Sequence, residues 1–486
     1  MSTEIKALEP NMIWEHFYQL TQIPRPSKHE EAIQEFMVKF GKGLGLETIK
    51  DQVGNVIIRK PATPGREDLK GVILQGHLDM VPQANSDKDH DFTKDPISPR
   101  IDGDWVAADG TTLGSDNGIG VAAAMAVLAS KDIDHGPVEA LFTTDEESGM
   151  SGAFGLKPDV LQGDILMNMD SEDEGNLYVG CAGGIDGNFT FDAELNDVPE
   201  GCDAYKISVT GLRGGHSGID IDQGRGNAIK ILFRYLFEHQ NELGIRLGAI
   251  KGGSLRNAIP REAFATLVVP SKHSAGLAES AATLKKVIQS ELGSVDPGLE
   301  ITIDRTDMPE IVLSEDTQDR LTKAIYGCPN GVLGMTQDMP GLVESSSNLA
   351  VVELKKQTIT VQCLLRSSVD SAKQDFANSI GSVFQLAGAK VDFGGGYPGW
   401  KPNMDSAILK VMQDTYQQLY GKVPEIKAIH AGLECGLLGG TYPRLDMISF
   451  GPTIVAPHSP DEKVNIESVG KFYTWLLEAL KNVPKK

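Results

Sequence analysis

Short runs of consecutive apolar residues, most of them ending in polar or charged side chains, constrain the fold of this chain more than any other feature. They are GVILQG (71–76), PVEALFT (137–143), DILMNMD (164–170) and LDMISFGP (445–452). A strand that is apolar along its whole length is buried on both faces, which is typical of parallel sheets covered by helices. Helical patterns occupy 29–43 and 118–130, so strand and helix alternate. The sequence therefore predicts an α/β domain with a mainly parallel sheet.

A different pattern fills the middle of the chain. Strands such as NFTFDAEL (188–195) and DAYKISVTGL (203–212) alternate apolar and polar residues, which indicates one buried and one wet face. Amphipathic helices are expected at 226–243 and 275–293. This block predicts an α+β domain with an antiparallel sheet.

The first pattern returns near the C-terminus, with helices expected at 406–420 and 468–483. The simplest arrangement is one α/β domain interrupted by an inserted α+β domain. We predict the first part of the α/β domain at 1–186, the inserted domain at 187–396 and the second part at 397–486.

Length and composition exclude several classes of protein. A chain of 486 residues is long enough for two cores. The net charge of −22 disfavours a nucleic-acid partner. We expect no signal peptide, and no apolar run approaches the length that a membrane span requires. The five scattered cysteines indicate reduced thiols in the cytoplasm rather than disulfides or a zinc knuckle.

Candidate metal ligands follow the expected strands. His77 and Asp79 come after the first run, Asp170 ends another, and His458 lies in a Pro-rich loop after the last. Asp116 lies in a Gly-flanked turn at a helix entrance, where a helix N-cap is the alternative interpretation. Each residue alone is weak evidence, and a lone histidine is more often structural. Together they fall where an open parallel sheet binds ligands.

Three adjacent acids, Asp145, Glu146 and Glu147, follow the strand at 137–143. They could form a solvated loop or supply a metal ligand and a base. Adjacent side chains of an extended segment point to opposite sides. Glu146 and Glu147 therefore cannot face one ion in the same way unless the backbone turns, which Ser148-Gly149 permits.

Imidazole and carboxylate groups together suit zinc, cobalt or manganese rather than a thiolate site. Two such ions need a shared ligand, and an aspartate can bridge them. A pair of ions generates hydroxide near neutral pH and polarises a carbonyl oxygen.

The ordered segments GHLDMV, GSDNGIG, TTDEESG, MNMDSEDEG and APHSPDE resemble the M20 clan of di-zinc aminopeptidases and dipeptidases. The stretches GCAGGID, RNAIPREAFAT and HAGLECGL, among others, resemble the cytosolic bacterial aminoacyl-histidine dipeptidases. The resemblance covers nearly the whole chain. It implies a di-zinc peptidase catalytic domain with an inserted lid domain, which carries dimer contacts in many members and here would give a homodimer.

The resemblance also implies metal roles. His77 and Asp170 would hold one ion, Glu147 and His458 the second, and Asp116 would bridge both, commonly with a cis peptide to Asn117. The two ions would be zinc, with cobalt or manganese as alternatives.

The same resemblance implies two catalytic roles beside the ions. Asp79 would contact the imidazole of His77 and fix its tautomer. Glu146 would be the general base toward the hydroxide that bridges the metals. Asp145 is left as a solvated or supporting acid.

Three lid positions match residues that contact substrate in relatives. His216 would stabilise the oxyanion, Arg366 would bind a free C-terminal carboxylate, and Asn257 would contact substrate. Without the resemblance, His216 would be a structural turn residue, Arg366 a surface strand residue and Asn257 a turn cap. HAGLECGL would line the pocket, and Glu434 could meet a substrate amine or imidazole.

The resulting hypothesis is a cytoplasmic metallo-dipeptidase. It would hydrolyse dipeptides, notably Xaa-His dipeptides such as β-alanyl-histidine (carnosine), with no nucleic-acid or membrane partner. The alternatives are an N-acyl amino acid deacylase on the same scaffold and a non-catalytic peptide-binding protein.

Overall fold

The chain folds into two compact units in a computed structural model that describes residues 3–337 and 339–486. Unit 1 comprises the described residues up to Gly180, Pro402–Ala428 and Leu433–Lys486. Unit 2 comprises Cys181–Lys401 and Ile429–Gly432. The boundaries expected from the sequence, 186/187 and 396/397, lie inside unit 2 and a few residues from the ends of its main segment.

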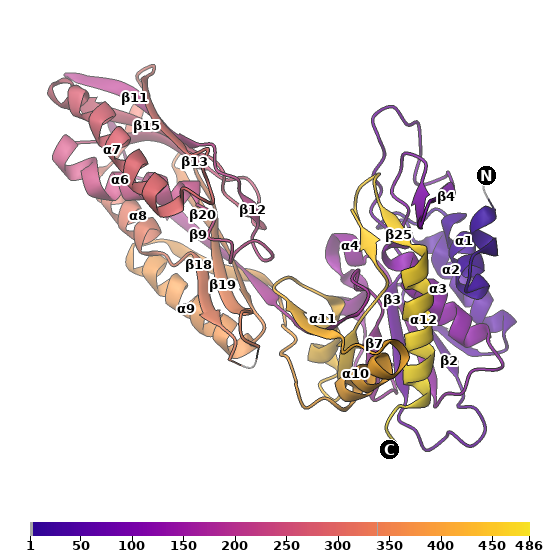
Figure 1. Cartoon of the computed structure of the whole chain (residues 1–486). Coiled ribbons are helices and arrows are strands. Elements are labelled where there is room, and N and C mark those ends of the chain that lie inside the picture. The colour runs from indigo at the N-terminus through magenta and orange to yellow at the C-terminus, as the bar shows by residue number, and fades with distance from the viewer. Residues whose placement is uncertain (1–2, 338) are drawn as a thin grey trace. The chain divides into compact units, whose positions relative to one another are not determined.

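Unit 1 is built on an eight-stranded sheet with the order β1-β2-β6-β3-β7-β23-β8-β22 (Figure 1). Its strands are β1 (Glu47–Lys50), β2 (Val56–Lys60), β3 (Val72–His77), β6 (Val138–Thr143), β7 (Ile165–Asn168), β8 (Asn176–Cys181), β22 (Glu425–Ile429) and β23 (Asp446–Ser449). The four central strands β6, β3, β7 and β23 run parallel. Strands β1 and β2 on one side, and β8 on the other, pair antiparallel. The parallel arrangement predicted from the sequence therefore holds at the centre of a mixed sheet.

Three of the four central parallel strands, β3, β6 and β7, are buried along their whole length, as is typical of parallel sheets covered on both faces. Every residue of β3 and β6 is buried, and α3 (Ser115–Ala129), which is rich in Gly and Ala, packs on β3. The other helices of unit 1 are η1 (Glu4–Ala7), α1 (Asn11–Thr21), α2 (Glu31–Gly43), α4 (Glu146–Gly149), α5 (Ser151–Gly155), α10 (Ala407–Tyr420), α11 (Glu434–Thr441) and α12 (Ile466–Lys481). A four-stranded sheet contains β4 (Pro99–Asp102), β5 (Trp105–Ala108), β24 (Ile454–Val455) and β25 (Lys463–Asn465).

Unit 2 contains a nine-stranded sheet whose helices all lie on one face (Figure 1). The strands, antiparallel in every register given, are β9 (Gly183–Asp192), β11 (Cys202–Thr210), β13 (Arg246–Gly252), β15 (Ala263–Pro270), β16 (Glu300–Arg305), β18 (Gly331–Met335), β19 (Val343–Lys355), β20 (Thr358–Ser367) and β21 (Lys390–Tyr397). The helices are α6 (Ala228–Leu243), α7 (Ser274–Leu292), α8 (Glu315–Gly327) and α9 (Asp370–Leu386), with the short η2 (Ser271–His273). Strands β10 (Leu195–Asp197) with β17 (Ile311–Leu313), and β12 (Gly215–His216) with β14 (Ala258–Ile259), form two small sheets.

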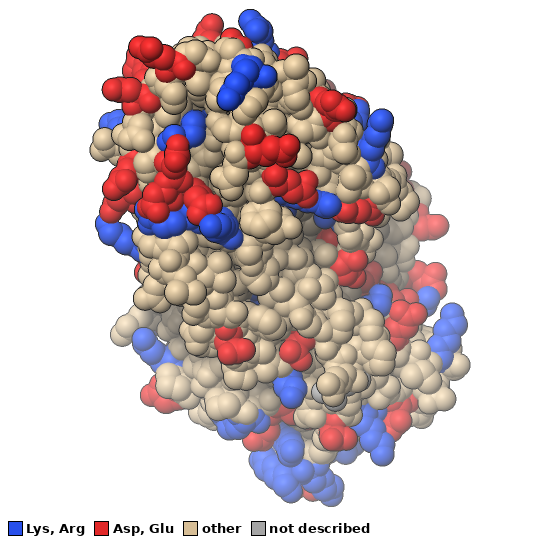
Figure 2. Space-filling model, turned by 90° about the vertical axis from the view of Figure 1, so that its left-hand side faces the viewer, with Lys and Arg blue, Asp and Glu red and all other residues tan. Residues whose placement is uncertain are grey.

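The face of the molecule over the helices of unit 2 carries charges of both signs (Figure 2). Asp and Glu side chains are interspersed there with Lys and Arg side chains. Among the described helices, none is long and apolar enough to cross a membrane.

Candidate metal centre

His77 ends strand β3 with its ring fixed by the loop that follows. Its Nδ1 lies 3.1 Å from the carbonyl oxygen of Asp79 and 3.4 Å from Oδ1 of the same residue. A protonated Nδ1 donates to these oxygens and leaves the Nε2 lone pair free. That Nε2 lies 3.1 Å from Oδ1 of Asp116 and 3.2 Å from Oδ1 of Asp170. The ring is thus oriented as a metal ligand requires.

Asp116 lies between the two histidines of the site. Its Oδ2 is 3.2 Å from Nε2 of His458, while its Oδ1 faces His77. The N-cap of α3 is Gly114, and Asp116 has non-helical backbone angles within a kink, so the N-cap interpretation of Asp116 is wrong. The Asp116–Asn117 peptide is cis.

Two overlapping groups of side chains could each hold one metal ion. His77, Asp116 and Asp170 form the first group, and Asp116, Glu147 and His458 form the second; within each group the donor atoms lie within 4.8 Å of one another. Asp116 belongs to both. Three of the ligand candidates follow the adjacent parallel strands β3, β6 and β7, whose carboxyl ends meet at one edge of the sheet. Asp116 comes from the kinked first turn of α3, and His458 from the loop after β24.

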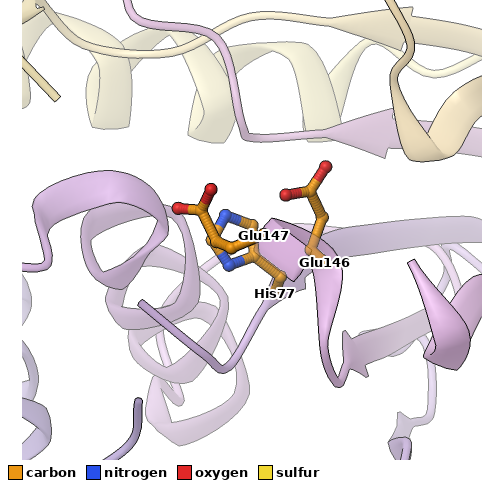
Figure 3. Close-up of side chains that lie close together, drawn as sticks. All are labelled: His77, Glu146 and Glu147. Atoms are coloured by element: carbon orange, nitrogen blue, oxygen red, sulfur yellow. The ribbon is translucent and has the colours of Figure 1, made fainter. Parts of the chain in front are cut away.

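The adjacent acids are separated by a turn of the backbone. Asp145 has a φ of 54° and Glu146 begins the short helix α4, so the turn precedes the pair rather than following it at Ser148-Gly149. Figure 3 shows both glutamate carboxylates on the same side as the His77 ring, with Glu147 over the ring and Glu146 beside it. The oxygen Oε2 of Glu147 lies 2.9 Å from Nε2 of His458.

Asp145 is buried, which makes the solvated-loop interpretation of this residue wrong. Its carboxylate accepts hydrogen bonds from the hydroxyls of Ser148 and Ser151, and its backbone nitrogen donates to Glu30. The side chain therefore stabilises the turn that carries the two glutamates.

Asp79 connects the His77 loop to the glutamate pair. Its carboxylate accepts from the backbone nitrogens of Glu146 at 3.0 Å and Glu147 at 3.1 Å, and from the hydroxyl of Ser27 at 2.8 Å. Burial would raise the pKa of Asp79, but the hydrogen bond and charge of His77 lower it to about 2. The group is therefore an anion that orients its neighbours.

The electrostatics of the cluster favour bound cations. Burial, with the charges of Asp116 and Glu147, raises the pKa of Asp170 to about 7. Oδ1 of Asp170 and Oε1 of Glu147 are buried and accept no hydrogen bond. Unpaired buried carboxylate oxygens are costly. Oxygen and imidazole donors suit zinc and similar divalent ions, so these residues fit a pair of such ions.

Glu462 and Arg25, which the sequence motifs did not single out, hold the entrance of α3. Glu462 is 2 % exposed and accepts five hydrogen bonds; the donors are the backbone nitrogens of Leu113, Gly114, Ser115 and Asp116 and the hydroxyl of Ser115. Arg25 donates to the carbonyl oxygens of Leu78, Asp79 and Gly114. These contacts join the His77 loop, the Asp116 turn and the loop of His458.

Gly114 tolerates no side chain at this junction. Its φ is 72°, and a Cβ there would lie 2.7 Å from Nη2 of Arg25. The glycine lets the guanidinium approach the backbone next to Asp116.

Glu434 lies beneath the cluster rather than on a surface that a ligand could reach. It is 1 % exposed, and its Oε2 accepts hydrogen bonds from Gln75 at 2.6 Å and Thr143 at 2.7 Å. Burial raises its pKa to about 8. The expectation that Glu434 meets a substrate amine or imidazole is therefore not met, because the side chain is enclosed by unit 1.

The three lid candidates lie in unit 2. Arg366 is 5 % exposed, so it is not a surface strand residue; its Nη1 donates to the hydroxyl of Tyr397 at 3.1 Å. Nδ1 of His216 accepts from the backbone nitrogens of Gly218 and Ile219, both at 3.1 Å, which leaves its Nε2–H as a donor.

Asn257 is exposed in a turn before β14, and its carbonyl oxygen accepts from the backbone nitrogen of Ser217. Both interpretations of Asn257 remain compatible with this position.

Comparisons with known proteins agree with the geometry. Residues 73–482 match the model of Peptidase family M20/M25/M40. The chain is 48 % identical to the "Cytosol non-specific dipeptidase" of Escherichia coli strain K12, over 100 % of both chains. It is 49 % identical to the solved aminoacylhistidine dipeptidase of Vibrio alginolyticus, with a TM-score of 0.95 over 100 % of this chain and 99 % of that one.

The fold is shared more widely. The aminopeptidase PepT of Bacillus cereus, at 17 % identity, aligns with a TM-score of 0.62 over 98 % of this chain and 99 % of that one. Because the family model spans most of the sequence, this chain belongs to peptidase family M20/M25/M40.

Proposed function

We propose that this chain is a dipeptidase of the cytosol that depends on two divalent metal ions. The observation that carries the proposal is the shared carboxylate of Asp116, which faces His77 with one oxygen and His458 with the other. Zinc is the first candidate, with cobalt or manganese as alternatives. The two relatives at 48 % and 49 % identity are named as dipeptidases, which supports dipeptides as substrates, including Xaa-His dipeptides such as β-alanyl-histidine.

In this proposal His77 and Asp170 hold one ion, Glu147 and His458 hold the other, and Asp116 holds both. When bound, two such ions lower the pKa of water and polarise a carbonyl oxygen. Oδ1 of Asp170 and Oε1 of Glu147, which accept no hydrogen bond, are the atoms that such ions would use.

Glu146 is the proposed general base. Burial raises its pKa well above the usual value, so its carboxylate holds a proton more readily than a free glutamate does, as a group that takes and returns a proton requires. Its carboxylate would take a proton from the attacking water and deliver it to the nitrogen of the leaving amine. Asp79 holds the backbone nitrogen of Glu146 and thereby the position of this base.

Unit 1 and unit 2 would be the catalytic and lid domains, respectively. In unit 2, the buried Arg366 would bind the free carboxylate of the dipeptide, since a guanidinium matches a carboxylate bidentately. The Nε2–H of His216 would donate to the developing oxyanion, and Asn257 would contact the substrate.

A substrate panel tests this proposal directly. The protein is stripped with a chelator, reloaded with zinc, cobalt or manganese, and assayed with alanyl-histidine, β-alanyl-histidine, alanyl-alanine, trialanine and N-acetyl-histidine. We expect metal-dependent hydrolysis of the free dipeptides. Hydrolysis of N-acetyl-histidine without hydrolysis of alanyl-histidine would instead identify a deacylase. Binding of dipeptides without turnover by any reloaded form would identify a non-catalytic binding protein.

We also propose that unit 2 forms a homodimer. Phe237 and Tyr326 stack on its surface with ring centroids 4.1 Å apart, and they are 44 % and 40 % exposed. Exposed aromatic pairs of this kind are enriched at protein interfaces. Light scattering after size-exclusion chromatography measures the mass, and a monomer at micromolar concentration would contradict the proposal.

A further inference from the structure

A row of buried polar side chains crosses the parallel strands just before the metal-ligand candidates. From one end to the other, the polar row consists of Ser171, Ser449, Asn168, Gln75 and Glu434, and Thr143 joins its last member. Ser171 is 8 % exposed, Glu434 is 1 % exposed and the others are fully buried. Buried polar side chains in the centre of a parallel sheet are costly unless they are hydrogen-bonded, so such a row requires an explanation.

The row follows the register of the sheet. Gln75 of β3 lies opposite Asn168 of β7, and Asn168 lies opposite Ser449 of β23. Gln75 and Asn168 each stand two residues before a metal-ligand candidate, His77 and Asp170 respectively. Side chains two apart on a strand share a face, so the row lies directly beneath the strand ends that carry the ligands.

Every hydrogen bond in the row points the same way. The hydroxyl of Ser449 donates to Oδ1 of Asn168 at 2.5 Å, and Nδ2 of Asn168 donates to Oε1 of Gln75 at 2.5 Å. Nε2 of Gln75 then donates to Oε2 of Glu434 at 2.6 Å. Since the proton of Ser449 is committed to Asn168, Ser171 must donate to Ser449 across their 2.7 Å contact.

Glu434 decides this direction because its Oε2 already accepts hydrogen bonds from both the Gln75 amide and the Thr143 hydroxyl. With an acceptor fixed at this end, each amide of the row has one orientation that satisfies both neighbours. A shift of β7 against β3 by one residue would leave these amides without partners, at a cost of about 1–3 kcal/mol for each buried group. The row therefore specifies one register and one set of side-chain orientations.

We propose that the polar row positions His77 and Asp170 for metal binding, and that Glu434 sets the direction of the row. The inference rests on the proposed metal centre and adds a role for six residues that touch no ion. Metal sites require ligands held within a few tenths of an ångström, and supporting hydrogen bonds supply that precision.

Reversal of the Gln75 amide is the decisive test. Asn168→Asp places an acceptor against Oε1 of Gln75, and rotation of the Gln75 amide would only move the conflict to Glu434. Adding Glu434→Gln supplies a donor at that end, so the Gln75 amide can rotate to accept from residue 434 and donate to the aspartate, while Ser449 still donates to the aspartate, all at the same net charge. The double variant N168D/E434M removes the charge of Glu434 but supplies no donor, and is the matched control.

The measurement is the zinc dissociation constant, determined by competition with a chromophoric chelator, together with the urea midpoint of the metal-free protein. We expect N168D to weaken zinc binding about 10–100-fold, N168D/E434Q to recover most of this loss, and N168D/E434M to recover little. Equal recovery by both double variants would mean that charge relief alone explains the effect. Unchanged zinc affinity in N168D would also overturn the inference.

Two further variants keep the result interpretable. Ser449→Ala removes one hydroxyl from the row and is a milder change if N168D does not fold; weaker zinc binding is expected, and unchanged binding would overturn the role. Thr322→Val removes a hydrogen bond to the buried Gln240 in unit 2, and should lower the urea midpoint without changing zinc affinity. A wild-type chain that binds no zinc would refute the metal centre itself, whereas tight wild-type binding with an unaffected N168D refutes only the row.

Discussion

The backbone nitrogen of Asp116 lies 3.2 Å from Oε1 of Glu462, although 346 residues separate them in the chain. The same carboxylate receives four further hydrogen bonds at the entrance of α3. Glu462→Gln would keep the shape but turn an NH2 group toward backbone N–H donors. We expect a loss of about 2–4 kcal/mol in the free energy of unfolding of the metal-free protein, measured in urea, and weaker zinc binding.

The matched control for this change is Glu467→Gln. Glu467 is exposed and pairs with Lys471 at 2.9 Å on the surface of α12, where such pairs contribute little. A loss of stability in E467Q as large as in E462Q would contradict the role assigned to the buried carboxylate.

The two adjacent glutamates should fail in different ways. Glu146→Gln is expected to bind zinc as the wild type does but to lower kcat by about 100–10,000-fold, because it removes the proton carrier. Glu147→Gln is expected to lower the zinc content, because it removes a ligand. Metal analysis after dialysis, combined with kcat on alanyl-histidine, separates the two. Near-normal kcat in E146Q would show that another group carries the proton.

Arg366 should matter for substrates with a free carboxylate. Arg366→Lys loses the bidentate fork, so we expect KM for alanyl-histidine to rise about 10-fold or more, with less effect on its C-terminal amide. Arg305→Lys is the control, because Arg305 is 74 % exposed in unit 2. An equal rise in KM for both substrates in R366K would show that Arg366 does not act by binding the substrate carboxylate.

His430 should make unit 2 sensitive to acid. Burial and the charge of Arg366 lower the pKa of His430 from 6.5 to about 4, and its Nε2 lies 2.7 Å from the hydroxyl of Ser346. Between these pH values the unfolded chain binds a proton that the folded chain does not, so stability falls as the pH falls. The loss reaches at most about 3 kcal/mol.

Urea midpoints at pH 7 and pH 5 check this expectation. His430→Gln can still contact Ser346 but does not titrate, so its midpoint should fall less than that of the wild type. His29→Gln, at an exposed position, should retain the wild-type difference. If H430Q retains it as well, His430 is not the source of the acid sensitivity.

Local pattern was sufficient for the elements that surround the site. Strands β3 and β6 and helix α3 lie close to their expected positions, because an apolar run buried on both faces leaves little choice of structure. The candidates His77, Asp116, Glu147, Asp170 and His458 lie in two overlapping groups of nearby side chains. Their metal roles came from family resemblance and remain proposals.

Misassignments arose where a side chain's environment depends on distant segments. In the sequence, Asp145 is one of three adjacent acids that look equivalent. In the structure it is buried, and it stabilises a turn by accepting hydrogen bonds from two serine hydroxyls. The sequence suggests that Glu434 lines a pocket, but its side chain is buried and accepts hydrogen bonds from Gln75 of β3 and Thr143 of β6. Nothing in the residues next to either acid distinguishes these environments.

The sequence by itself determined the kind of sheet at the centre of unit 1 and the presence of an inserted second unit, because apolar periodicity is a local property; the metal roles of the candidate side chains are implied by family resemblance. Only the tertiary structure decided what holds those side chains in place. Arg25, Glu462 and the polar row act through hydrogen bonds between segments far apart in the chain. Such partners are fixed by the packing of strands and loops against one another, which no single stretch of sequence specifies.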